Sequence, residues 1–134
     1  MMQKLLFILN ESPYGTEKSF NALRLAVNLQ EEHGKEVEIK VFCFGDSVLS
    51  GIAGQHPNEG SNVQQVMEIL VAQGAEVKLC TSCTKARGLF EAKLIDGITR
   101  GTLDDVSKWT LWADKVVNLS LIHISEPTRQ AEIS

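Results

Sequence analysis

Short apolar runs alternate along this chain with longer segments in which apolar residues recur every three or four positions. The run at 5–9 is continuously apolar, which is typical of a strand covered on both faces, and we expect it to be the central strand. The predicted strands lie at 5–9, 37–44, 76–80 and 115–119, and the predicted helices at 16–33, 61–73, 84–90 and 103–113. This alternation predicts a three-layer α/β fold in which helices cover both faces of a mainly parallel, doubly wound sheet.

Polar residues and glycines mark where these elements should begin and end. Ser61 with Gln64, and Thr102 with Asp105, fit the capping-box pattern, in which two side chains satisfy the first free amides of a helix. Segment 51–60 holds three glycines and a proline, so it predicts a long loop. In the last helix the apolar positions expected to face the core are Leu103, Val106, Trp109 and Ala113.

Composition and charge narrow the class of protein. The 134 residues are 43% hydrophobic and 22% charged, which is ordinary for one globular domain. The net charge of −4 argues against nucleic acid or an anionic membrane as a partner, because both need clustered lysine and arginine. The start of the chain lacks the pattern of a signal peptide, and the three cysteines do not suggest a disulfide framework. We therefore expect a cytoplasmic protein with reduced thiols.

The most specific chemical motif is Cys80-Thr81-Ser82-Cys83, which places two thiols three positions apart where a predicted strand ends. Free amides at the start of a following helix favour a thiolate, and Lys85 and Arg87 would add positive charge. The pair is compatible with a sulfur carrier, a redox dithiol, half of a zinc site or two packed core cysteines. The sequence offers neither a second Cys-x-x-Cys nor a histidine pair at zinc-ligand spacing, so no metal is expected.

Other candidate residues have plain structural explanations beside the functional ones. His56, in the predicted loop, would exchange a proton with a nearby thiol, although a solvated loop histidine is the commoner outcome. Glu59 and Asp96 are either polar neighbours of the site or exposed carboxylates. Cys43 lies inside an apolar run and should be a buried, inert thiol. No glycine-rich phosphate motif is present, so no cofactor is expected.

Many short stretches, in order, carry a family resemblance. In the first half these are Pro13-Tyr14-Gly15, residues 20–26, Gly54-Gln55 and Glu59-Gly60. In the second half they are Gln64-Gln65, residues 68–70 and 77–80, Cys83-Thr84, Arg87-Gly88 and residues 94–97, 101–103, 109–111 and 113–116. Over residues 2–119 the chain resembles the DsrE/DsrF-like family, in particular its YchN-like branch.

This resemblance implies a flavodoxin-like domain over residues 1–119, with about five strands, that assembles as a homo-oligomer, a trimer or a hexamer. It also implies a sulfur-relay protein, either a sulfur carrier or a sulfurtransferase. In that reading Cys80 holds sulfane sulfur as a persulfide and exchanges it with donor and acceptor proteins, and Cys83 is the auxiliary thiol. Two alternatives stay open: a non-catalytic oligomeric module that binds a small ligand or a protein, and a dithiol redox switch.

The last segment, residues 120–134, differs in character from the rest. It resembles the translation of a sequencing adapter, so we expect a non-native tail. A natural disordered tail is the alternative, and in both cases His123 carries no chemistry.

Overall fold

Five strands pair in parallel within residues 2–119, the part of the chain that the computed structural model describes. They are β1 (Gln3–Leu9), β2 (Val37–Cys43), β3 (Glu76–Cys80), β4 (Thr99–Gly101) and β5 (Lys115–Val117). Their order across the sheet is β4-β3-β2-β1-β5. Because every pairing is parallel, the carboxyl ends of all five strands lie at one edge of the sheet, where α/β proteins commonly place their sites.

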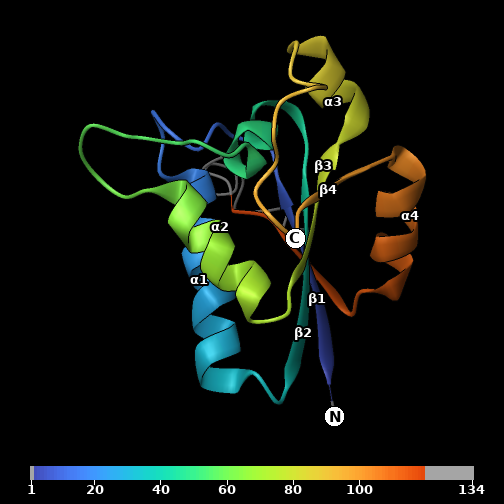
Figure 1. Cartoon of the computed structure of the whole chain (residues 1–134). Helices are drawn as coiled ribbons and strands as arrows, with labels where there is room; N and C mark the ends of the chain where they lie inside the picture. Colours follow the sequence, from blue (N-terminus) through green and yellow to red (C-terminus); the bar gives the residue numbers. More distant parts are fainter. Residues whose placement is uncertain (1, 120–134) are drawn as a thin grey trace, which may run out of the picture.

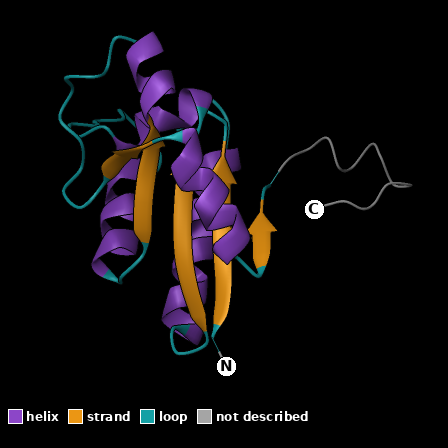
Figure 2. Ribbon diagram, turned by 90° about the vertical axis from the view of Figure 1, so that its right-hand side faces the viewer, coloured by secondary structure: helices purple, strands orange, loops and turns teal. Residues whose placement is uncertain are grey.

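Helices cover both faces of this sheet and produce the three expected layers (Figure 1). They are α1 (Lys18–His33), α2 (Val63–Ala72), α3 (Thr81–Ala86) and α4 (Leu103–Trp112), with a 3-10 helix, η1 (Gly45–Gly51), soon after β2. Helices α1 and α2 lie on one face and α4 on the other, and Figure 2 shows helices in front of and behind the strands. The predicted doubly wound α/β fold is confirmed.

The core lies on both faces of the inner strands. Phe7 of β1 and Phe42 of β2 are completely buried, as are Leu23 of α1 and Leu70 of α2. On the face of the sheet that α4 covers, Trp109 meets Phe42 edge to face, with ring centroids 6.1 Å apart. Each large apolar side chain buried in this way stabilises the fold by roughly 1.5–3 kcal/mol.

The strand predictions differ from the structure at two points. The central strand is β2, whereas the run at 5–9 forms β1, the next strand toward β5. A continuous run of apolar residues indicates only that a strand is covered on both faces, and this is true of every inner strand of the sheet. The edge strand β4 was not predicted, because Thr99-Arg100-Gly101 has no apolar alternation and is defined by its pairing with β3.

The helix boundaries bring three further corrections. The cap of α2 is Asn62, whose side chain accepts the Gln65 amide, and not Ser61. The Gln64 side chain accepts the amides of Gly54 and Gln55 and so holds the preceding loop. The helix predicted at 84–90 begins earlier, as α3, because Cys80 itself caps it.

The fourth helix has the predicted capping box at Thr102 and Asp105. Val106 and Trp109 of this helix are buried as expected. Leu103, the first residue of α4, is 70% exposed, so the expectation that it faces the core is wrong. No helix within residues 2–119 is long and apolar enough to cross a membrane. The predicted tail at 120–134, with His123, lies outside the described residues.

Candidate functional site

Cys80 is both the last residue of β3 and the cap of α3, so the direction of its sulfur is set by two elements. Its Sγ accepts the Cys83 amide at 3.4 Å and lies 3.3 Å from the Ser82 hydroxyl. The Thr84 hydroxyl donates to the Cys80 carbonyl at 2.6 Å, and this buried bond fixes the turn. The strand-to-helix junction therefore surrounds one sulfur atom with hydrogen-bond donors.

These donors change the acidity of Cys80. Burial by itself would raise the pKa of this thiol, but hydrogen bonds from the side chains of Ser82 and Cys83 and from their backbone amides outweigh burial and lower it. The pKa of Cys83 is raised, first by burial and then by the hydrogen bond that its thiol makes with Cys80. Cys80 therefore ionises before Cys83, and the Cys83 thiol stays protonated beside the Cys80 thiolate.

Arg87 contacts Cys83 and also Asp46, an acidic residue that was not predicted from the sequence. Its guanidinium is paired with the Asp46 carboxylate, at 2.9 Å from both Nε and Nη2, and its Nη1 donates to the Cys83 carbonyl at 3.1 Å. The positive charge of Arg87 and the Gly45 amide both favour a Cys83 thiolate, although burial dominates. Asp46 could have been found from its position directly after β2, because neighbouring parallel strands end at the same edge.

A cavity of about 400 Å³ opens beside the two thiols. Its wall comes from the end of β2, the β3–α3 junction and the β4–α4 junction. The lining residues are Phe44, Cys80, Thr81, Ser82, Cys83, Lys85, Gly101, Thr102 and Leu103. The predicted residues Cys80, Cys83 and Lys85 are thus brought together, and Arg87 joins them through the Cys83 carbonyl.

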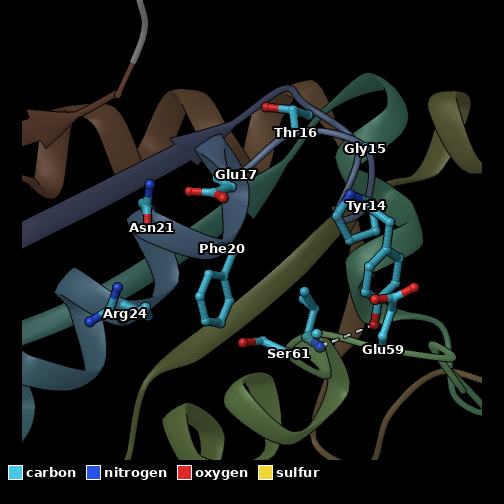
Figure 3. A pocket seen from close by; sticks show the side chains of 12 residues that line it. Tyr14, Gly15, Thr16, Glu17, Phe20, Asn21, Arg24, Glu59 and Ser61 are labelled. Carbon is cyan, nitrogen blue, oxygen red and sulfur yellow. Dashed lines mark hydrogen bonds between the residues drawn. The ribbon is translucent and has the colours of Figure 1, made fainter.

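His56 and Glu59 are exposed in the loop before α2, and neither lines this cavity. The Nδ1 atom of His56 lies 3.1 Å from the carbonyl of its neighbour Gln55. Glu59 instead lines a second hollow, of about 490 Å³, at the carboxyl end of β1. Figure 3 shows Glu17 and Arg24 on the α1 side of this hollow and Glu59, beside Tyr14, on the opposite side. Asp96 is exposed in the segment between α3 and β4.

The third cysteine is separate from this chemistry. Cys43 is completely buried in β2, as predicted, and burial raises the pKa of its thiol to about 12, with a smaller opposing effect of a hydrogen bond from Ser47. Within residues 2–119 no three histidine, cysteine or acidic side chains gather in a way that could hold a metal ion.

Comparison with known proteins gives consistent matches over nearly the whole described chain. The profile of the DsrE/DsrF-like family matches residues 3–119. The chain is 47% identical to the protein YchN of Escherichia coli K12 over 116 residues, which are 87% of this chain and 98% of that protein. It is 41% identical to an uncharacterized protein of Methanopyrus kandleri, covering 82% of this chain and 88% of the other.

Solved structures agree with the fold. The crystal structure of YchN from E. coli superposes with a TM-score of 0.84 at 47% identity, covering 88% of this chain and all of that one. A protein of unknown function from Methanobacterium thermoautotrophicum superposes with a TM-score of 0.59 at 17% identity, covering 84% and 96% of the two chains. The second likeness bears on the fold alone.

Proposed function

This chain belongs to the DsrE/DsrF-like family, and from that premise and the cysteine geometry we propose that it carries sulfane sulfur as a persulfide on Cys80. The observation that carries the proposal is the position of the Cys80 sulfur, which accepts the Cys83 amide, lies 3.3 Å from the Ser82 hydroxyl and lines an open cavity. These hydrogen bonds lower the pKa of Cys80 and so increase the fraction of thiolate. Thiolates attack sulfur, and thiols do not.

The same surroundings suit the product. In the transfer step the Cys80 thiolate forms a bond to the outer sulfur of a donor persulfide, and the donor's own S–S bond breaks to release a thiolate. The persulfide anion left on Cys80 is again a negatively charged sulfur, which the Ser82 hydroxyl and the Cys83 amide can stabilise. Passing the sulfur on is the reverse reaction with a different thiol, so no oxidant or reductant is needed.

Intact mass spectrometry tests this proposal directly. After the reduced protein is incubated with inorganic polysulfide, we expect the mass of added sulfur on the native chain, removed again by dithiothreitol. Cys80→Ala should abolish the addition, whereas Cys43→Ala, a matched change of a buried thiol, should leave it intact. Added sulfur that persists in Cys80→Ala would exclude Cys80 as the carrier.

A dithiol redox switch is the second candidate, because Cys83 lies in the first turn of α3 with its amide donating to the Cys80 sulfur at 3.4 Å. The two functions differ in the fate of the pair under a mild oxidant without sulfane sulfur. A switch forms a Cys80–Cys83 disulfide with a defined potential, while a carrier needs only Cys80 and still accepts sulfur in Cys83→Ser. A binding module with structural cysteines would show slow alkylation of both thiols in the folded state.

We also propose that the protein works as a homo-oligomer, a trimer or hexamer, in the cytoplasm, where thiols stay reduced. Support for self-association comes from Leu111 of α4, which is 88% exposed and does not line the cavity. A relay role requires a sulfur donor and a sulfur acceptor, and the charge of −4 gives no support to nucleic acid as a partner.

A further inference from the structure

The cavity beside Cys80 is lined by apolar residues and one charged residue in addition to the reactive sulfur. Phe44, at the end of β2, and Leu103, at the start of α4, supply apolar walls. Gly101 forms part of the wall where β4 pairs with Cys80, and a Cβ there would meet Phe42 and Lys78 at about 3 Å. Any side chain larger than hydrogen at Gly101 would therefore displace the packing at this part of the wall.

One charged residue lines this apolar space. Lys85 is the only lysine, arginine, aspartate or glutamate among the residues that line the cavity. Its ammonium lies 4.8 Å from the centre of the Phe90 ring, a cation–π contact with a residue outside the cavity lining, so binding an anion would draw the side chain from that ring. A ligand that fits this site has an apolar carbon skeleton and an anionic end.

Access to the sulfur restricts the ligand further. Cys80 is only 6% exposed, so a sulfur atom displayed on a folded protein surface would need a projecting arm to meet it. A small molecule can enter the cavity of about 400 Å³ whole and bring its reacting sulfur to the wall where Cys80 lies.

We infer that the site exchanges sulfur with a low-molecular-weight organic persulfide that bears a carboxylate, with the carbon skeleton against Phe44 and Leu103 and the carboxylate toward Lys85. This inference rests on the proposed function, since it names the substrate class of the same cysteine. Lys85 then acts as a binding residue that distinguishes anionic from neutral donors.

The transfer balances without a further reactant. The Cys80 thiolate forms a bond to the terminal sulfur of R–S–SH, and the S–S bond of the donor breaks with its electron pair going to R–S⁻. The proton on Cys83 passes to that leaving thiolate, and the new persulfide on Cys80, which is acidic, returns its proton to Cys83. The products are R–SH and a Cys80 persulfide anion.

A matched pair of donors tests the assignment. The hydropersulfides of 3-mercaptopropionate and 3-mercaptopropionamide differ only in the carboxylate, and the rate of sulfur addition to Cys80 is followed by intact mass. For the native chain we expect the carboxylate donor to react about fivefold faster, as one partly exposed ion pair allows. That preference should vanish in Lys85→Gln and return in Lys85→Arg.

The control variant is Lys93→Gln, which removes an exposed positive charge that does not line the cavity. It should keep the native preference, which separates a local contact from the overall charge. Leu103→Asp should slow the carboxylate donor more than the amide donor, because it places a like charge on the rim.

The outcomes distinguish a failure of the inferred donor class from a failure of the carrier function. Sulfur added equally fast from both donors, or a preference unchanged in Lys85→Gln, would overturn the inference and leave the carrier function standing. Faster addition from a folded protein that carries a surface persulfide than from either small donor would overturn it as well. No addition to Cys80 from any donor would remove the carrier function itself.

Discussion

At the scale of single residues, the two thiols of the site are unequal because their neighbours are unequal. Cys80 has hydrogen-bonding contacts with the Ser82 hydroxyl and the Cys83 amide that lower its pKa, whereas burial and the neighbouring Cys80 raise the pKa of Cys83. Most of this inequality comes from residues that follow Cys80 directly. The sequence motif could therefore identify the pair, but the order in which the two thiols ionise required the hydrogen-bond geometry.

The pH dependence of alkylation follows from this difference. The lowered pKa of Cys80 places the midpoint of its reaction with iodoacetamide below that of an ordinary thiol, since reactivity rises as pH increases through the pKa. Ser82→Ala removes one stabilising contact of the thiolate and should move the midpoint to higher pH. The midpoint is read from rates across pH by peptide mass mapping. An unchanged midpoint would show that the Ser82 hydroxyl does not stabilise the thiolate.

Cys43 should behave in the opposite way. Its burial and raised pKa of about 12 keep it neutral and inaccessible, so we expect no alkylation in the native state. In denaturant it should react like a free thiol. The fraction of Cys43 modified can then be compared with unfolding followed by circular dichroism, and labelling well below the unfolding transition would contradict this expectation.

The ion pair between Arg87 and Asp46 should influence the acidity of Cys83. Asp46→Asn weakens the ion pair that holds the guanidinium against the Cys83 carbonyl. Because Arg87 favours a Cys83 thiolate, its release should raise the pKa of Cys83 further. The expected result is slower closure of a Cys80–Cys83 disulfide under diamide, while sulfur loading of Cys80 is retained. Asp104→Asn, on the exposed start of α4, is the control.

At the scale of elements, close packing between η1 and β3 supports the end of the strand on which Cys80 lies. A Cβ at Gly51 would meet the two methyl groups of Leu79 at 2.7 and 2.8 Å, and Leu79 is completely buried. Gly51→Ala should therefore lower the free energy of unfolding by about 1–3 kcal/mol, as overpacking does. Urea denaturation measures it, and Ser107→Ala on the exposed face of α4 should change it by no more than about 0.5 kcal/mol.

The sequence predicted elements best where periodicity was strong and side-chain chemistry was local. The run 76–80 became β3 with those bounds, and the capping box at Thr102 and Asp105 is present. The strand β4 has no such pattern and exists because β3 offers it a pairing edge. Asn62 replaced Ser61 as a cap because Gln64 is engaged by the loop, and that competition depends on contacts outside the helix.

At the scale of the whole molecule, the uneven covering of the sheet suggests how copies of the chain meet. Two helices lie on one face, while α4 lies on the other and exposes Leu111. We expect Leu111→Ser to reduce the oligomer mass measured by sedimentation, because it removes apolar surface from a contact between copies. Leu25→Ser, a matched change on α1, should leave the mass unchanged. A native chain that sediments as a monomer would contradict the proposed assembly.

The acidity of Cys80 is supplied largely by the next three residues, with two of their side chains and two of their amides acting on its sulfur. Its seclusion, by contrast, is supplied by distant parts of the chain, from Phe44 to Leu103. Nucleophilic strength and choice of reactant can therefore diverge independently in evolution. A descendant could inherit the tetrapeptide unaltered and acquire a new reactant by exchanging Phe44, Lys85 or Leu103.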